Sequence, residues 1–208
     1  MKHQVVVYYA FCPNFFESKK IYRKHQRELE DKILSYDFIN RFNIQFEKNN
    51  VGKGEYGKPY WKGKENIHFN VSNTDGLVVC ACSDCEVGVD AEKAREIREP
   101  VLKRCCNSEE ISYIFQERDT LYSALAGEED SVQNRFLQIW TLKESYIKMT
   151  GKGMHFPLQD VTFSIERENE VQIKSSQPGY FVQERRGDYW ISLCAEEEAE
   201  VVWREINF

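Results

Sequence analysis

Two acidic residues end a short apolar run in the first half of the chain, Val87–Glu92. Side chains alternate between the two faces of a β-strand, so Asp90 and Glu92 are expected to point the same way. Two carboxylates on one face repel each other, and a bound divalent cation would relieve that repulsion. Ligands made of oxygen alone suit Mg²⁺, which proteins bind through one or two carboxylates plus substrate phosphates. The alternative is that the strand ends here and both acids are solvated, as most acids are.

A second candidate lies in the helical pattern of residues 135–150, where Glu144 and Lys148 stand four residues apart and share a face. One interpretation is a surface ion pair worth about a few tenths of a kcal/mol. The other is a third carboxylate for the metal, with a cation beside it for phosphate charge. The spacing alone leaves both open.

A glycine- and lysine-rich stretch, Gly52–Pro59, imitates a phosphate-binding P-loop. Pro59 occupies the position of the P-loop Ser or Thr and offers neither a hydroxyl nor an N–H, so we reject that interpretation. What remains is a loop whose Lys53 and Lys58 could contact an anion. The basic run Lys19–Arg27 is either a solvated helix face or a further phosphate contact.

The elements that would position these residues follow from hydrophobic periodicity and turn signals. Helices are predicted over residues 18–46, 108–116 and 135–150, the last ending at a Gly151 cap. Strands are predicted over residues 5–9, 67–71, 77–82, 87–91, 161–167, 171–174, 180–185, 189–195 and 201–206. Helix-then-hairpin order occurs twice, which predicts an α+β fold with an N-terminal half, residues 1–99, and a C-terminal half, residues 100–208.

Composition narrows the class of protein. The chain has 208 residues, 41% of them hydrophobic, and a net charge of −6, which predicts a globular protein that is not built to coat nucleic acid. Its apolar runs are too short to cross a bilayer, and the N-terminus lacks the features of a signal peptide. We therefore expect no membrane partner and a cytoplasmic location. The seven cysteines are expected to be reduced, with Cys80, Cys82 and Cys85 buried rather than holding a metal.

Taken together, the motifs resemble the surfactin-type 4′-phosphopantetheinyl transferases. The matching segments run from residue 56 to residue 153 in the order and spacing of that family: Tyr56-Gly57-Lys58-Pro59-Tyr60, His68-Phe69-Asn70-Val71-Ser72, Gly88-Val89-Asp90-Ala91-Glu92, and Trp140-Thr141-Leu142-Lys143-Glu144-Ser145-Tyr146-Ile147-Lys148 with Gly151-Lys152-Gly153. The Trp-x-x-Lys-Glu-x-x-x-Lys element is the most specific of them.

The resemblance implies a monomer of two similar subdomains related by a pseudo-twofold axis, each with antiparallel strands packed on a long helix, and coenzyme A bound between them. It implies that Mg²⁺ is held by Asp90, Glu92 and Glu144, with Glu110 as a further acid near the metal. It also implies cofactor contacts from Lys148 to the phosphates and from a set around the nucleotide: Arg27, Lys58, Pro59, Ser72 and Asn73. Asn73 departs from the family, which usually has His there; an amide donates a hydrogen bond but carries no charge.

The implied reaction moves 4′-phosphopantetheine from coenzyme A to a serine of an apo acyl or peptidyl carrier protein and releases 3′,5′-ADP. Such transfer needs positioning and charge neutralisation more than covalent help. Glu144 is the expected base and Lys148 the cation at the leaving phosphate, with a hydroxide on the metal as the competing base. Two other classes stay open: a non-catalytic module that binds coenzyme A or a carrier protein, and a Mg²⁺-dependent nucleotide phosphohydrolase. The sequence leaves open which pathway the carrier serves.

Overall fold

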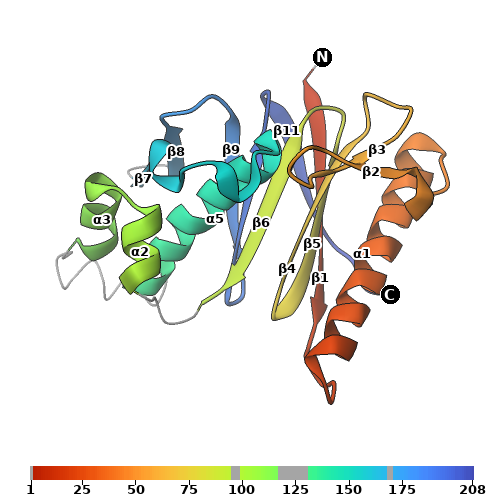
Figure 1. Ribbon diagram of the computed structural model, residues 1–208, viewed down its shortest axis with the longest axis horizontal. Coiled ribbons are helices and arrows are strands. Elements are labelled where there is room, and N and C mark those ends of the chain that lie inside the picture. Colours follow the sequence, from red (N-terminus) through yellow and green to blue (C-terminus); the bar gives the residue numbers. More distant parts are fainter. Residues whose placement is uncertain (1, 95–98, 117–130, 168–170) are drawn as a thin grey trace.

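The computed structural model describes residues 2–94, 99–116, 131–167 and 171–208 (Figure 1). The strands are β1 (His3–Cys12), β2 (Val51–Lys53), β3 (Pro59–Trp61), β4 (His68–Thr74), β5 (Gly76–Ser83), β6 (Val87–Lys93), β7 (Phe163–Arg167), β8 (Val171–Ser175), β9 (Tyr180–Arg186), β10 (Tyr189–Ala195) and β11 (Ala199–Glu205). The helices are α1 (Lys19–Phe42), α2 (Glu99–Cys105), α3 (Ser108–Phe115) and α5 (Val132–Thr150), with single 3₁₀ turns at Lys48–Asn50, Gly153–His155 and Leu158–Asp160.

The elements stack as helix, sheet, sheet, helix. One sheet has the strand order β11-β1-β5-β4 and the other β6-β10-β9. Alternate residues of β1 separate two cores: Val5 and Val7 pack between the sheets, while Val6 and Tyr8 pack under α1. The second sheet does the same, with Ile191 facing the first sheet and its other face covered by α5. Figure 1 shows α1 and α5 on the two outer sides of this stack.

Because each sheet is buried on both faces, its strands carry nearly continuous apolar runs instead of an alternating pattern. This is why Leu77–Cys82 has no polar side chain and is fully buried. The seven cysteines are all buried and unpaired, as expected for structural thiols. The predicted α+β class, with antiparallel strands, is confirmed. One pair, β1 with β11, runs parallel.

The two sheets do not divide at the expected boundary between residues 99 and 100. Strand β6, from the first half of the chain, pairs with β10, and β11, from the second half, pairs with β1. Each half therefore contributes a strand to the sheet of the other. This exchange carries Asp90 and Glu92 into the sheet that packs on α5.

Local capping explains where the two long helices begin and end. Ser18 caps α1, accepting from the Ile21 N–H at 3.3 Å, and Asn43 caps its other end in a left-handed conformation, so the helix stops at Phe42, four residues before the predicted end. Helix α5 begins after Ser131 and ends at Gly151, φ +67°, as predicted. It lies close against β6, because a Cβ on Gly88 would sit 2.1 Å from the Ser145 carbonyl oxygen.

Two predictions of local structure were incomplete. The stretch expected to be a loop contains the short β2–β3 hairpin, in which Val51 pairs with Trp61, and Trp61 packs on Phe38 of α1. Helix α2 was not predicted. Within the described residues, no helix combines the length and the apolar character that a membrane span requires.

Candidate active site

Side chains of β4 hold β6 in place where the two sheets meet. The Asn70 carboxamide oxygen accepts from the Val89 N–H at 3.0 Å, and the Ser72 hydroxyl accepts from the Ala91 N–H at 3.2 Å. These bonds satisfy backbone donors on the edge of β6 that no strand of its own sheet covers. They also fix the residue between them, Asp90, against β4.

Asp90 is a buried carboxylate with one oxygen satisfied and one not. Its Oδ1 accepts from the Ser72 hydroxyl at 3.0 Å and from the Lys148 ammonium at 2.7 Å. Its Oδ2 is buried and has no hydrogen-bond partner among the residues that the structure describes. A buried carboxylate oxygen that accepts no hydrogen bond destabilises the fold, so this atom is a candidate ligand for a cation.

Glu144 lies close enough to Asp90 and Glu92 to be affected by both charges. Burial, and then the charge of Asp90, raise the pKa of Glu144; Lys148 opposes the shift and Glu92 adds to it, which leaves the pKa at about 7. Glu92 accepts from the Thr74 hydroxyl at 3.3 Å. The three acids expected to act together therefore converge, two from β6 and one from α5.

Lys148 is the cation of this group, and all three of its protons are used. Besides Asp90, its ammonium donates to the Ser72 hydroxyl at 3.0 Å and to the Val89 carbonyl at 3.1 Å. The side chain is 27% exposed, because it also reaches the adjacent pocket.

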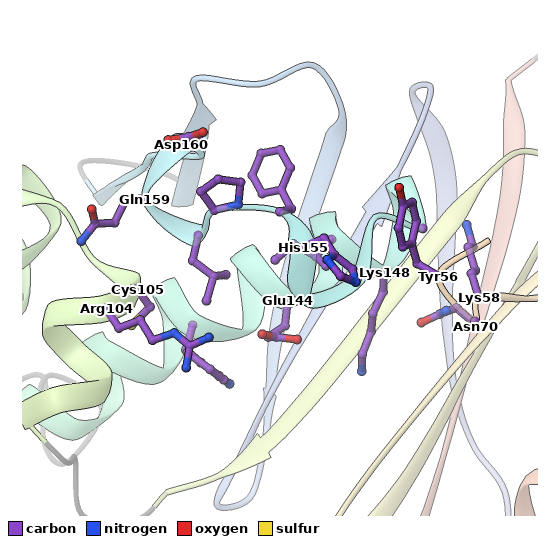
Figure 2. Close-up of a pocket in the computed structure, with 18 of the residues that line it drawn as sticks. Tyr56, Lys58, Asn70, Arg104, Cys105, Glu144, Lys148, His155, Gln159 and Asp160 are labelled. Carbon is purple, nitrogen blue, oxygen red and sulfur yellow. The ribbon is translucent and has the colours of Figure 1, made fainter. Parts of the chain in front are cut away.

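A pocket of about 920 Å³ opens beside the carboxylates. Figure 2 shows Glu144 and Lys148 projecting into it from α5 on one side of the helix. Its walls are largely apolar and come mostly from α5, α2 and the turns after α5, and among the described residues they carry two further cations, Lys58 and Arg104. The residues that give it this character include Trp140, Ile147, Phe156, Pro157 and Leu158. Its size suits a ligand as large as a cofactor.

The donor set fits a hard divalent cation. Asp90, Glu92 and Glu144 offer only oxygen, which Mg²⁺ prefers. The unpartnered Asp90 Oδ2 supplies a free ligand atom, and a cation would offset the burial and the repulsion by Asp90 that raise the pKa of Glu144. A cation held there would face the pocket, where a ligand's phosphates could complete its coordination.

Glu110, which the resemblance placed near the metal, is not brought to this group. It is fully buried and is the third residue of a capping box at the start of α3, with the Asn107 N–H donating to its Oε2 at 3.0 Å. Lys143 donates to the same oxygen at 2.6 Å, and the Phe163 N–H donates to Oε1 at 2.9 Å. Both oxygens are satisfied by the protein, so none is left for a metal.

Lys58 and Pro59 line the pocket, but Lys58 is already engaged. Its ammonium donates to Glu86 and, at 2.6 Å, to the Met149 carbonyl near the end of α5. Burial alone would raise the pKa of Glu86, but hydrogen bonds from His68 and Lys58, with the Lys58 charge, lower it to about 2. In this structure, Lys58 joins the β2–β3 hairpin to α5.

Arg27 and Asn73 lie on another part of the surface, where α1 meets the end of β4. The Asn73 amide donates to Glu30 at 2.7 Å, and the charge of Arg27 acts on the same carboxylate. Burial is the main cause that raises the pKa of Glu30. Both residues are exposed, and neither is among the described residues that line the pocket. Ser72, between Asn73 and the acids, connects the two areas.

Sequence reasoning missed two residues of the site, Asn70 and Arg104. Asn70 stands two residues before Ser72, on the same face of β4, so strand alternation was a signal that could have found it. Arg104 lies in α2, which was not predicted, and no local pattern marked it.

Comparisons with known proteins agree with the resemblance. A sequence model of the 4′-phosphopantetheinyl transferase superfamily matches residues 86–194, just over half of the chain. The 4′-phosphopantetheinyl transferase Sfp of Bacillus subtilis (strain 168) is 29% identical over 190 residues, which cover 88% of this chain and 78% of the relative. The 4′-phosphopantetheinyl transferase gsp of Aneurinibacillus migulanus is 38% identical over 154 residues, 74% of this chain and 57% of the relative.

Among solved structures, the holo-[acyl-carrier-protein] synthase of Thermotoga maritima aligns over 55% of this chain and 64% of its own. The sequence identity is 16% and the TM-score 0.39, too slight a likeness to support an argument.

Proposed function

This chain belongs to the 4′-phosphopantetheinyl transferase superfamily and is a transferase of 4′-phosphopantetheine from coenzyme A to carrier proteins, and we propose how its site performs the transfer. In the proposal, Asp90, Glu92 and Glu144 hold Mg²⁺ opposite the diphosphate of coenzyme A. When bound, the ion supplies charge neutralisation at the two phosphates. The acceptor is a serine hydroxyl of an apo carrier protein, and the other product is 3′,5′-ADP.

The residues around the acids take distinct roles. Lys148 gives up part of its contact with Asp90 and donates to the phosphate oxygens. Glu144 accepts the serine proton as the new P–O bond forms and the bond to 3′,5′-ADP breaks. The pKa of Glu144 is about 7 before a cation binds and would fall when one does, so Glu144 would be an ionised carboxylate able to accept the proton near neutral pH.

The pocket beside Glu144 is proposed to take the phosphopantetheine arm. The arm is long and mostly uncharged, which suits walls that are largely apolar. The nucleotide end is proposed to lie toward Ser72 and Asn73, with Arg27 and Lys58 nearest its phosphates. Asn73 carries no charge, whereas a His at position 73 could share in attracting the 3′-phosphate. Arg27 therefore supplies a larger part of that attraction in this chain.

Two features of the fold favour a pseudo-twofold relation between the halves. Each outer layer is one long helix, α1 or α5, and each lies on the outer face of a mostly antiparallel sheet. The two sheets pack face to face, and the proposed site lies where β4 meets β6. We propose that the halves are duplicated and that the chain acts as a monomer in the cytoplasm.

A single observation carries the proposal: Asp90 is buried, paired on one oxygen with Lys148 and unpartnered on the other, beside two further carboxylates. The two further carboxylates set this oxygen apart from Asp37 Oδ2, which is also buried without a hydrogen-bond partner among the described residues and lies in the ion pair with Arg41.

The experiment is incubation of the chain with coenzyme A, Mg²⁺ and a panel of apo carrier proteins, followed by intact-protein mass spectrometry. The expected result is a mass gain of one phosphopantetheine on at least one carrier, and no gain when Mg²⁺ is chelated. Glu144→Gln is expected to abolish the gain, and Glu200→Gln, at an exposed position on β11, serves as the matched surface control. Near-normal transfer by Glu144→Gln would remove Glu144 from the mechanism.

The same assay separates the other two classes. A nucleotide phosphohydrolase would release 3′,5′-ADP and leave the carrier unmodified. A binding module would give neither product.

A further inference from the structure

Three potential metal ligands of different chemistry meet where β1 begins. An imidazole nitrogen of His3, a carboxylate oxygen of Asp84 and the sulfur of Cys85 lie within 4.8 Å of one another. His3 opens β1, and the other two residues form the turn between β5 and β6. None of the three is among the described residues that line the pocket.

His3 lies between two carboxylates. Its Nδ1 is 3.1 Å from Asp84 Oδ1, and its Nε2 is 3.3 Å from Glu197 Oε2. A neutral imidazole carries one N–H, so it can donate to only one of them. The unprotonated nitrogen then points its lone pair at a carboxylate oxygen, and the two acceptors repel each other. Either a second proton or a cation at that nitrogen resolves the conflict.

The remaining two ligands are held in place by the backbone. The Gln4 N–H donates to Asp84 Oδ1 at 3.2 Å, and the Ser83 hydroxyl accepts from the Cys85 N–H at 3.1 Å. Burial alone would raise the pKa of Asp84, but the Gln4 N–H and His3 lower it below its usual value, so this group is a carboxylate at neutral pH. The Cys85 thiol is buried, 3.4 Å from the Ser83 hydroxyl.

We propose that His3, Asp84 and Cys85 form a second metal site, for a borderline-soft divalent cation such as Zn²⁺. A sulfur, nitrogen and oxygen set suits Zn²⁺ or Co²⁺ and not Mg²⁺, and three protein ligands leave a fourth position for water. Nδ1 is the ligand atom, because it faces Asp84. Nε2–H then donates to Glu197, an arrangement that commonly fixes the tautomer of a metal-bound histidine.

The geometry needs little change to accept the ion. Zinc–ligand bonds of about 2.0–2.3 Å place neighbouring ligand atoms roughly 3.5 Å apart, so atoms that lie within 4.8 Å of one another must draw in by roughly 1.3 Å at most. Binding replaces the thiol proton of Cys85, so a proton is released and the affinity rises with pH. This site is made of different residues from the proposed active site, so each of the two proposals can be tested independently of the other.

The test is a titration of the untagged, metal-stripped full chain with Co²⁺ in saturating Mg²⁺, which occupies the oxygen-only site. One equivalent is expected to produce a sulfur-to-cobalt charge-transfer band with the visible bands of tetrahedral Co²⁺, and Zn²⁺ is expected to displace it. Cys85→Ser should remove the charge-transfer band. Glu197→Gln should weaken the affinity by about 10- to 100-fold, as loss of a group that orients a ligand does.

Cys12→Ser is the matched control, because Cys12 is another buried thiol at the opposite end of β1. It should keep the band. If Cys85→Ser does not fold by circular dichroism, His3→Gln at the surface takes its place and should lower the affinity at least tenfold. A wild-type chain with no thiolate band, or a band lost equally in Cys12→Ser, would overturn the site and leave His3 as a protonated partner of two carboxylates.

Discussion

Helix α5 carries two lysines that each meet a carboxylate from another element, at nearly the same distance. Lys143 lies 2.6 Å from Glu110, and Lys148 lies 2.7 Å from Asp90. The first pair is completely buried, and the protein satisfies both oxygens of Glu110. The second pair borders a pocket and leaves Asp90 Oδ2 without a hydrogen-bond partner in the described parts of the chain.

The difference separates a structural pair from a functional one. Lys143 also donates to the carbonyls of Cys105 and Leu158, so it ties α2 and the turn after α5 to the helix. Lys148 has two further carboxylates close by, Glu92 and Glu144, and burial followed by the charge of Asp90 raises the pKa of Glu144. Distance alone does not distinguish the pairs, but the state of the carboxylate oxygens does.

The largest expected effect is on the structural pair. Lys143→Met should lower the free energy of unfolding by about 3–5 kcal/mol, because it leaves Glu110 charged and buried without its cation. Urea unfolding measures it. The double variant Lys143→Met with Glu110→Leu should recover much of the loss. A single variant within about 1 kcal/mol of wild type would show that the pair is not structural.

The functional pair should respond in the opposite way. Asp90→Asn keeps the hydrogen bonds from Ser72 and Lys148, so the free energy of unfolding should change by no more than about 1 kcal/mol. Transfer of phosphopantetheine should fall by at least about 100-fold, since a charged ligand atom is lost. Mass spectrometry of the carrier and urea unfolding together measure both quantities. If Asp90→Asn lost stability in proportion to its loss of activity, the proposed difference between the two pairs would be wrong.

Glu144→Gln should make the chain more stable in the absence of a cation. The pKa of Glu144 is raised in the fold from 4.5 to about 7, so its contribution to stability is present below pH 4.5 and is lost as the pH rises to about 7. At pH 8 the free energy of unfolding of the variant should therefore exceed that of wild type by about 1–3 kcal/mol, and near pH 4 the two should be equal. Thermal unfolding at the two pH values checks this. The same difference in stability between variant and wild type at pH 8 and at pH 4 would contradict this prediction.

A third pair, Lys58 with Glu86, gives the smallest effect. The pKa of Glu86 is lowered from 4.5 to about 2, so its contribution is present above pH 4.5 and is lost as the pH falls toward 2. Its side chain is 42% exposed, so solvent screening limits the contribution to about 1 kcal/mol. Glu86→Gln should lower the free energy of unfolding by that amount at pH 7 and by nothing near pH 2. Urea unfolding across this range measures it.

Local periodicity was enough to predict which acids share a face, while their proposed role as a metal site came from the family resemblance. The spacing of Asp90 and Glu92 on a strand, and of Glu144 and Lys148 on a helix, predicted which side chains share a face, and each pair does converge on one place. The strands and long helices followed from the same periodicity, because buried faces repeat regularly along the chain.

What the sequence did not reveal depends on contacts between distant residues. The exchange of β6 and β11 between sheets is long-range pairing, which no local pattern encodes. Lys58 was expected to be available to an anion, but Glu86, 28 residues later, engages it. Glu110 was expected near the metal. Its position three residues after Asn107 is the spacing of a capping box, which indicates instead that Glu110 binds the start of the helix.

The most direct test of the account is to count bound cations at the carboxylates. Mn²⁺, which can replace Mg²⁺ and is visible by electron paramagnetic resonance, should bind the wild-type chain at one equivalent in the presence of coenzyme A, with Zn²⁺ saturating any sulfur-containing site. Asp90→Asn and Glu92→Gln should each weaken that binding at least tenfold, while the exposed control Glu200→Gln on β11 leaves it unchanged. Binding of Mn²⁺ to folded Asp90→Asn as tightly as to wild type would contradict the claim that these acids hold the metal.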